Sequence, residues 1–228
     1  MDVPYADVIP VVDEQIVQEA NPLAVFSHWT ALAHNGLTDQ IPTEIQATHC
    51  KPPAISRVPL GTAPEEWVGL DLPPLARPPK VGDVAVRWFQ TLGKWDFGRT
   101  ISYTQGLPIY VTDNERTLLD VLRSPDEAGG ILTVFRSWRR ARDVLNLDRV
   151  IDYTERFDQP IFRQRVGFVL EEVGFTHLTL AAWKTNLLRG GSLKLVPSLP
   201  YSPEFSPHWN ISLNVPASVI QELKDRPD

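Results

Sequence analysis

The distribution of proline is the feature that most constrains how this chain can fold. Twelve of the 21 prolines lie in the first 80 of the 228 residues, and they include the pairs Pro52-Pro53, Pro73-Pro74 and Pro78-Pro79. Proline has no backbone N–H and interrupts both helices and central strands. The sequence therefore predicts a loop-rich N-terminal third, followed by a more regular remainder that is long enough to bury a core.

Regular structure is expected at only a few places before residue 112. A helix is predicted over Val12–Ala20, and a second one begins after Ser27, a good N-cap, and stops at Asn35-Gly36. Residues 41–80 should otherwise form turns and short strands. The strands predicted before residue 112 are Ile45–Cys50, an alternating run over 84–89, and a hairpin about Gly106 whose second strand is Leu107–Val111.

From Thr112 the spacing of apolar residues becomes helical. Thr112 or Asp113 can cap a first helix, with Glu115 placed as in a capping box, and Ser124-Pro125 ends this helix. A second helix follows Gly129-Gly130. Its apolar stripe has steps of three and four residues and must be buried: Ile131, Val134, Phe135, Trp138, Ala141 and Leu145.

The C-terminal part is expected to hold more helices and then return to strand. A helix capped by Asp148 should end at Phe157, and a helix capped by Asp158 should end at Gly174. A third helix, capped by Thr176, should end at Gly190-Gly191, and a last short helix is expected at Ala217–Lys224. Strands are expected within Ser192–Val196 and Trp209–Val215. This order predicts an α+β fold with a mixed β-sheet and helices packed mainly on one face. An acidic, proline-rich region, 1–80, and an α+β domain, 81–228, should form one compact unit.

Cysteine content and hydropathy exclude several classes of protein. Cys50 is the only cysteine, so the chain cannot build an internal disulfide, a cysteine zinc site or an iron–sulfur cluster, and a reducing cytoplasm fits best. No apolar run approaches the roughly 20 residues that a membrane span needs. The acidic N-terminus lacks the basic start of a secretory signal. The sequence predicts a soluble cytoplasmic protein that has no contact with a membrane.

Charge is distributed unevenly along the chain. The net charge is −6, and residues 1–80 account for it with four basic against ten acidic residues. Ten arginines and no lysine lie between Arg116 and Arg165. Arginine suits planar pairing with carboxylate or phosphate, so this block is a candidate face for a partner or DNA, and the alternative is a set of helices with intramolecular ion pairs. The candidate residues are Arg136, Arg139, Arg140, Arg142, Arg163 and Arg165.

Familiar catalytic and ligand-binding motifs do not occur in the sequence. The phosphate-binding loops GxxxxGK[ST] and GxGxxG are missing, and the five histidines form no HExxH or two-histidine carboxylate cluster. Ser27 next to His28 is interpreted as a helix cap, because neighbours in sequence rarely face each other. Glu222 and Lys224 have the acid-x-lysine spacing of some nucleases but lie on a predicted helix. We therefore predict no catalytic residue, no cofactor and no metal site.

The tryptophans are expected mainly in the core. Trp67, Trp88, Trp95, Trp138, Trp183 and Trp209 lie mostly on apolar periodicities, which favours packing over the alternative of a stacking platform for bases. Trp29 directly follows the predicted helix start. It is the tryptophan for which we expect exposure.

Four blocks of sequence together resemble the AbiEi family, the antitoxins of type IV toxin–antitoxin and abortive-infection systems. They are SHWTALAHNGLTDQIPTEI (27–45), ERTLLDVL (115–122) with its following glycine pair, LDRVIDYTERFDQPIFRQRVGFVLE (147–171) with an arginine-x-glycine junction at 165–167, and WNISLNVP (209–216). They occur in the family's order, and the match covers about 21–217. Each block alone is weak, so the resemblance rests on all four in register.

The resemblance implies a non-enzymatic antitoxin whose functional partner is a nucleotidyltransferase toxin. Members of the family usually carry an N-terminal winged-helix domain that binds operator DNA. Only about 25 residues precede Ser27 here, and this segment is acidic, so the resemblance is to the C-terminal part, and promoter binding is not carried over. The chain also lacks the GS-x-D-x-D-type metal motif of the toxin itself.

Two functions of different classes follow from the sequence. The first is a bacterial antitoxin-like regulator in phage defence that counters a nucleotidyltransferase toxin. The alternative is a DNA-binding transcriptional repressor or defence component that uses the arginine-rich helices. DNA is the less favoured partner because its affinity depends on neutralising phosphates, and the chain has a net negative charge. An enzyme with an unrecognised site is a more distant third.

Overall fold

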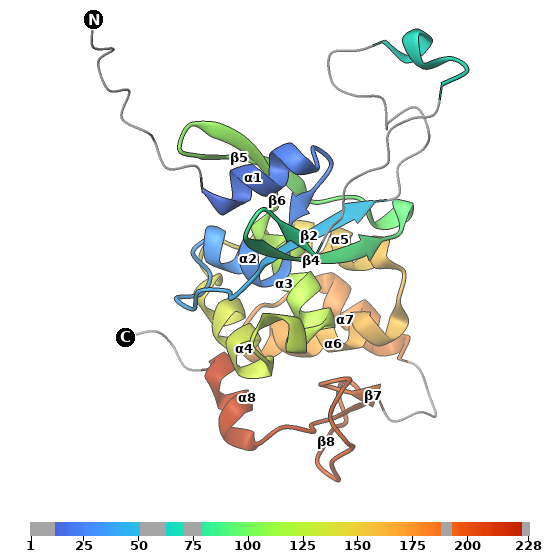
Figure 1. Ribbon diagram of the computed structural model, residues 1–228. Helices are drawn as coiled ribbons and strands as arrows, with labels where there is room; N and C mark the ends of the chain where they lie inside the picture. The colour runs from blue at the N-terminus through green and yellow to red at the C-terminus, as the bar shows by residue number, and fades with distance from the viewer. Residues whose placement is uncertain (1–11, 51–62, 71–78, 188–192, 225–228) are drawn as a thin grey trace, which may run out of the picture.

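A computed structural model describes residues 12–50, 63–70, 79–187 and 193–224 and confirms the α+β class (Figure 1). The helices are α1 (Asp13–Ala20), α2 (His28–His34), α3 (Asn114–Arg123), α4 (Ile131–Arg140), α5 (Leu147–Phe157), α6 (Pro160–Val173), α7 (Leu178–Thr185) and α8 (Ala217–Lys224). Short 3₁₀ segments are η2 (Pro64–Trp67), η3 (Gly93–Trp95) and η4 (Pro125–Ala128). None of the described helices is both long and apolar enough to cross a membrane.

The strands form two sheets. They are β1 (Val25–Phe26), β2 (Ile45–Cys50), β3 (Lys80–Val81), β4 (Val84–Thr91), β5 (Arg99–Thr104), β6 (Leu107–Thr112), β7 (Leu193–Lys194), β8 (Phe205–Ser206) and β9 (Ile211–Ser212). The first sheet has the order β3-β4-β2-β1-β6-β5 and is mixed, with β1 parallel to β6 and β2 parallel to β4. The second has the order β7-β9-β8.

Most helices lie between these two sheets. Figure 1 shows the six-stranded sheet above the helices, α1 beside the β5–β6 hairpin, and the small sheet with β7 and β8 below α6 and α7. The sequence predicted one mixed sheet. Its C-terminal strands instead form the second sheet, where Arg165 of α6 donates to the carbonyl oxygen of Lys194 in β7.

The boundary drawn at residue 80 does not separate two folding units. It falls inside β3, and β2 from the first region pairs with β4 from the second over six residues. A small core beneath the sheet also mixes the two regions, since Val17 and Phe26 pack with Val86 and Ile109. The two regions therefore share one structure, while prolines 52, 53, 73, 74 and 78 lie outside the described residues.

The hairpin and the helices occur where the periodicities predicted them, but several helix caps differ. Asp113 caps α3 by accepting a hydrogen bond from the N–H of Arg116, whereas Thr112 belongs to β6. Glu115 makes no capping box and accepts instead from the N–H of Asn146 at 2.8 Å.

The caps of the next helices are corrected in the same way. Asn146, not Asp148, caps α5. Asp158 does not cap α6; it ends α5 in a left-handed conformation, and α6 begins at Pro160. Helix α7 is capped by His177 rather than Thr176 and ends at Thr185, short of the predicted end at Gly190-Gly191, which lies with Ser192 outside the described residues.

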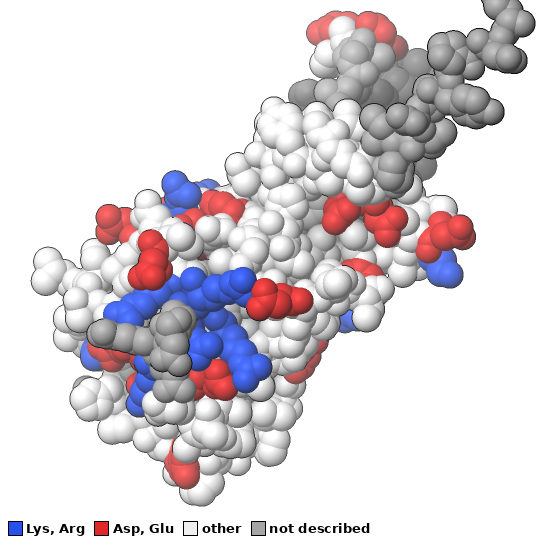
Figure 2. Space-filling model, turned by 90° about the vertical axis from the view of Figure 1, so that its left-hand side faces the viewer, with Lys and Arg blue, Asp and Glu red and all other residues white. Residues whose placement is uncertain are grey.

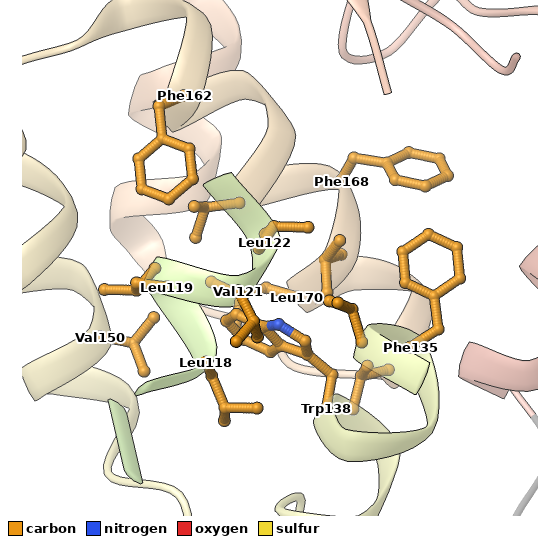
Figure 3. Packing of buried hydrophobic residues seen from close by; sticks show 14 of the residues in the cluster. Leu118, Leu119, Val121, Leu122, Phe135, Trp138, Val150, Phe162, Phe168 and Leu170 are labelled. Atoms are coloured by element: carbon orange, nitrogen blue, oxygen red, sulfur yellow. The ribbon is translucent and has the colours of Figure 1, made fainter. Parts of the chain in front are cut away.

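The main core is formed by the apolar faces of α3, α4, α5 and α6 together with the C-terminal strands. In Figure 3, the indole of Trp138 on α4 points towards Leu118 and Val121 of α3, whereas Phe135 of the same helix points towards Phe168 of α6. Four of the predicted stripe residues are fully buried: Val134, Phe135, Trp138 and Ala141. Trp183 and Trp209 are also buried, as expected, and Trp29 is half-buried rather than exposed.

Gly167 allows α6 to pack against the C-terminal sheet. A Cβ added at this position would lie 2.1 Å from Cη2 of Trp209. The indole of Trp209 is anchored there, because its Nε1–H donates to Oε2 of Glu171 at 2.7 Å. The arginine-x-glycine segment 165–167 therefore lies inside α6, within the helix predicted to end at Gly174, and its glycine receives an indole ring.

A buried ion pair joins α3 to the segment before β5. Nε of Arg116 donates to Oδ2 of Asp120 at 2.9 Å, and both side chains are almost fully buried. Nη1 of Arg116 donates to the carbonyl oxygens of Trp95 and Phe97. The guanidinium also lies over the rings of Phe97 and Phe157, at 4.5 and 4.9 Å. This one side chain thus links α3, η3 and α5.

We predict that Asp120→Asn lowers the free energy of unfolding by about 3 to 5 kcal/mol, because the buried charge of Arg116 then loses its counter-ion. The matched control is Asp152→Asn. Asp152 also pairs with an arginine four residues away, Arg156, but both side chains are exposed. Its loss should cost under about 1 kcal/mol. Urea unfolding followed by tryptophan fluorescence measures the stability of both variants. Equal losses would contradict the claim that Asp120 compensates a buried charge.

Gly167→Ala should destabilise the protein by about 1 to 3 kcal/mol, because the added methyl group overlaps the indole of Trp209. The control is Gly93→Ala, where no atom lies within 4 Å of an added Cβ and the backbone φ is ordinary. Thermal unfolding compares the two variants. A Gly167→Ala protein as stable as Gly93→Ala would show that α6 and Trp209 are not in close contact.

Candidate functional site

Three of the predicted arginines line one cleft. Arg136, Arg139 and Arg140 lie on a single face of α4, because residues three and four apart are neighbours on a helix. The opposite face of α4 carries the buried stripe, which fixes the direction of the arginines. Residues 37–40, which follow α2, form the other wall, and the cleft has a volume of about 470 Å³.

One carboxylate is shared by two of these arginines. Arg136 donates from Nε and Nη2 to the two oxygens of Glu222 on α8, at 3.2 and 2.9 Å. Arg139 donates from Nη1 to Oε2 of the same Glu222 at 3.2 Å. The hydrogen bond from Arg136 lowers the pKa of Glu222 and raises the pKa of Arg136.

The third arginine has a separate partner. Nη1 of Arg140 lies 2.8 Å from Oδ2 of Asp39, whose side chain is 87% exposed. Thr133 and Gln40 complete the polar lining, and Oγ1 of Thr133 donates to Oε1 of Gln40 at 3.2 Å. The three arginines of the cleft therefore have two carboxylate partners: Asp39 in the lining of the cleft, and Glu222 on α8, which does not line it.

The cleft belongs to a wider basic surface. Figure 2 shows lysine and arginine side chains gathered on the face of the molecule that carries α4 and α8, with acidic side chains among them. Lys224 of α8 adds to this surface and pairs with Glu172 at 3.0 Å. The intramolecular ion pairs that the sequence left as an alternative are therefore present, and they lie within a basic face.

The other three candidate arginines do not line the cleft. Arg142 lies next to the end of α6, with Nη2 3.3 Å from where a Cβ on Gly174 would be. Arg163 pairs with Glu155, which also accepts from Nε1 of Trp183. The six residues therefore do not form one binding face.

Arg165 has a structural position that the sequence did not indicate. Its side chain is buried, and Nε and Nη2 donate to the carbonyl oxygen of Lys194 at 3.2 and 3.1 Å. Burial lowers its pKa to about 10. Arg165 thus attaches α6 to β7 and is unavailable to a partner or to DNA.

Ser27 and His28 do face each other, contrary to the interpretation from sequence. Oγ of Ser27 lies 3.0 Å from Nδ1 of His28 and 2.6 Å from Oγ1 of Thr48, and it makes no capping bond to α2. His28 has a positive φ of 50°, and its ring stacks on Phe89 at 4.1 Å. Both members of the pair are buried, at 0 and 3% exposure, so the pair has no open access for a substrate.

Sequence reasoning missed the acidic partners of the cleft. Glu222 is 86 residues from Arg136, and no spacing rule connects them. Asp39 lies in the turn after α2 and was not singled out. Within the described ranges, no three His, Cys, Asp or Glu side chains form a group that could hold a metal ion. No protein-family model matches the chain, and no curated protein matches it.

The buried His28 predicts a loss of stability in acid. Burial lowers its pKa from 6.5 to about 4. Between these values the unfolded chain binds a proton that the folded chain does not, so stability attributable to His28 falls as pH drops from about 6.5 to about 4, and it is fully present above 6.5. Between pH 7.5 and 4.5, the free energy of unfolding should fall by about 2 to 3 kcal/mol because of His28.

The variant His28→Asn removes this group while keeping a residue that tolerates a positive φ. Urea unfolding at pH 7.5 and 4.5 should show a smaller loss for the variant than for the wild type. An identical loss in both proteins would mean that His28 is not responsible.

Proposed function

We propose that this protein is a non-enzymatic, antitoxin-like regulator that acts in the cytoplasm and counters a nucleotidyltransferase toxin. The proposal starts from the four sequence blocks that resemble AbiEi antitoxins. The observation that carries it is that residues from all four blocks pack in one core: Leu32 and Leu37, Leu118 to Leu122, Val150 to Leu170, and Trp209 to Val215. The four blocks therefore belong to one structural unit, as the resemblance requires.

Two contacts between blocks are specific to the residues that carry the resemblance. Gly167 in the third block receives Trp209 of the fourth. Glu115 in the second block accepts a hydrogen bond from the N–H of Asn146, just before the third block, and lies 3.4 Å from Nη1 of Arg149 within it. Residues that matter for a family's fold are expected at such close contacts.

The surface available to a partner is the arginine cleft of α4. Arg136 and Arg140 are about half exposed, and their charges are only partly compensated by Glu222 and Asp39. A protein partner with an acidic surface suits such a face, because charge complementarity favours encounter and orientation. We infer that toxin contact, where neutralisation requires it, uses this cleft.

DNA binding by a repressor is the alternative, and the basic face in Figure 2 is the observation that favours it. Phosphate contacts would give an affinity that falls steeply with salt. The net charge of −6 and the ion pairs of Arg136, Arg139 and Arg140 weigh against it. Binding of a DNA duplex at two salt concentrations, with the three arginines intact or changed to glutamine, separates the two functions.

Co-expression with a nucleotidyltransferase toxin of the class that AbiEi antitoxins counter should relieve the growth arrest that the toxin causes. The triple variant Arg136→Gln/Arg139→Gln/Arg140→Gln should fold and rescue less well. Arg142→Gln is the matched control, because it removes a charge from the same region without touching the cleft and should rescue like the wild type. Growth on induction of the toxin is the measurement. No rescue by the folded wild-type protein would contradict the antitoxin proposal.

A further inference from the structure

The arginine cleft holds its three guanidinium groups in an arrangement that suits an anion. Arg136 presents Nε and Nη2 side by side, which is the planar fork that matches a carboxylate or a phosphate. Arg139 reaches the same carboxylate from the next turn of α4. A single anionic group at the position of the Glu222 carboxylate is therefore held by two arginines.

The cleft has space and a third arginine beyond the ion pairs of Glu222. Its volume of about 470 Å³ lies within the range of sites for small molecules. The hydroxyl groups of Thr38 and Thr133 line it, and Arg140 stands one turn from Arg136. A phosphorylated molecule could therefore place its phosphate against the arginines and its remainder against the wall formed by residues 37–40.

We propose that this cleft binds a small phosphomonoester. When no ligand is bound, Glu222 and Asp39 form ion pairs with the guanidinium groups. Asp39 is 87% exposed and makes a single ion pair, whereas Glu222 is 23% exposed and is shared by two arginines. The side chains of Arg136 and Arg140 are 52 and 47% exposed, and ion pairs between exposed groups contribute little stability. Phosphate can therefore compete for the arginines at low cost.

The backbone of α8 does not have to move for this exchange. Ile220 and Leu223 are buried and hold α8 against the core, on either side of Glu222 in sequence. Only the Glu222 side chain has to turn away. A small ligand is favoured over a duplex because the arginines line a cleft with a second wall, and because the net charge of −6 opposes attraction of a long polyanion.

Because Glu222 competes with the ligand for the arginines, removing its charge should strengthen the binding of phosphate. Pyrophosphate and inorganic phosphate are the probes, titrated into the purified full chain and followed by isothermal calorimetry at low salt. Glu222→Gln should bind pyrophosphate at least threefold more tightly than the wild type, because the competing charge is gone. Asp39→Asn should show the same direction. Arg136→Gln and Arg139→Gln should each weaken binding at least tenfold, and Arg142→Gln should leave it unchanged.

Thermal unfolding of each variant establishes that it is folded before it is titrated. If Glu222→Gln does not fold, Asp39→Asn tests the same expectation. No binding of pyrophosphate by the wild type at millimolar concentration, or no gain on removing either carboxylate, overturns the proposal. A 12-base-pair DNA duplex that binds more tightly than pyrophosphate, with a steep salt dependence, overturns it in favour of nucleic acid. These measurements use no toxin, so their outcome is independent of growth rescue.

Discussion

The ion pair between Arg116 and Asp120 is the interaction on which the rest of this structure depends. The side chain of Arg116 is only 3% exposed, so its positive charge must be compensated within the protein. Asp120, two backbone carbonyl oxygens and two aromatic rings do this together. These partners come from three places: Asp120 from α3 itself, Trp95 and Phe97 from the segment before β5, and Phe157 from α5. The Arg116 side chain, held by Asp120, therefore fixes α3 relative to that segment and to α5. Since β5 and β6 belong to the large sheet, it also joins that sheet to the helices.

The helical layer in turn positions the C-terminal strands and the basic face. Gly167 opens a space on α6 for the indole of Trp209, and Arg165 donates to the backbone of β7, so the small sheet is held against α6. Helix α8 then packs on α4 and brings Glu222 to the arginines. The burial of Phe135 and Trp138 on one side of α4 is what directs Arg136, Arg139 and Arg140 to the other side, where a partner can reach them.

The arginine cleft unites the two proposals physically. Its guanidinium groups are partly neutralised by carboxylates from α8 and from the turn after α2, and any anionic partner competes with these carboxylates. An acidic protein surface or a phosphate group has to bind the arginines better than these carboxylates do.

Ser27 and His28 resemble a reactive pair of residues in the sequence. In the structure both side chains are buried, and they form a packed contact.

Local features of the structure could be predicted from sequence because they depend on neighbours along the chain. The apolar stripe 131–145 predicts the buried face of α4, and Gly106 predicts the hairpin of β5 and β6. The caps of α5 and α6 were misjudged because several polar residues near each helix start could serve, and tertiary contacts chose among them. The partners of the arginines were beyond sequence reasoning: Glu222 and Arg136 are 86 residues apart, and Arg165 pairs with a backbone carbonyl. Periodicity determined which faces are buried, whereas only the tertiary structure decided which charges meet, because ion pairs and sheet membership depend on distance in space rather than in sequence.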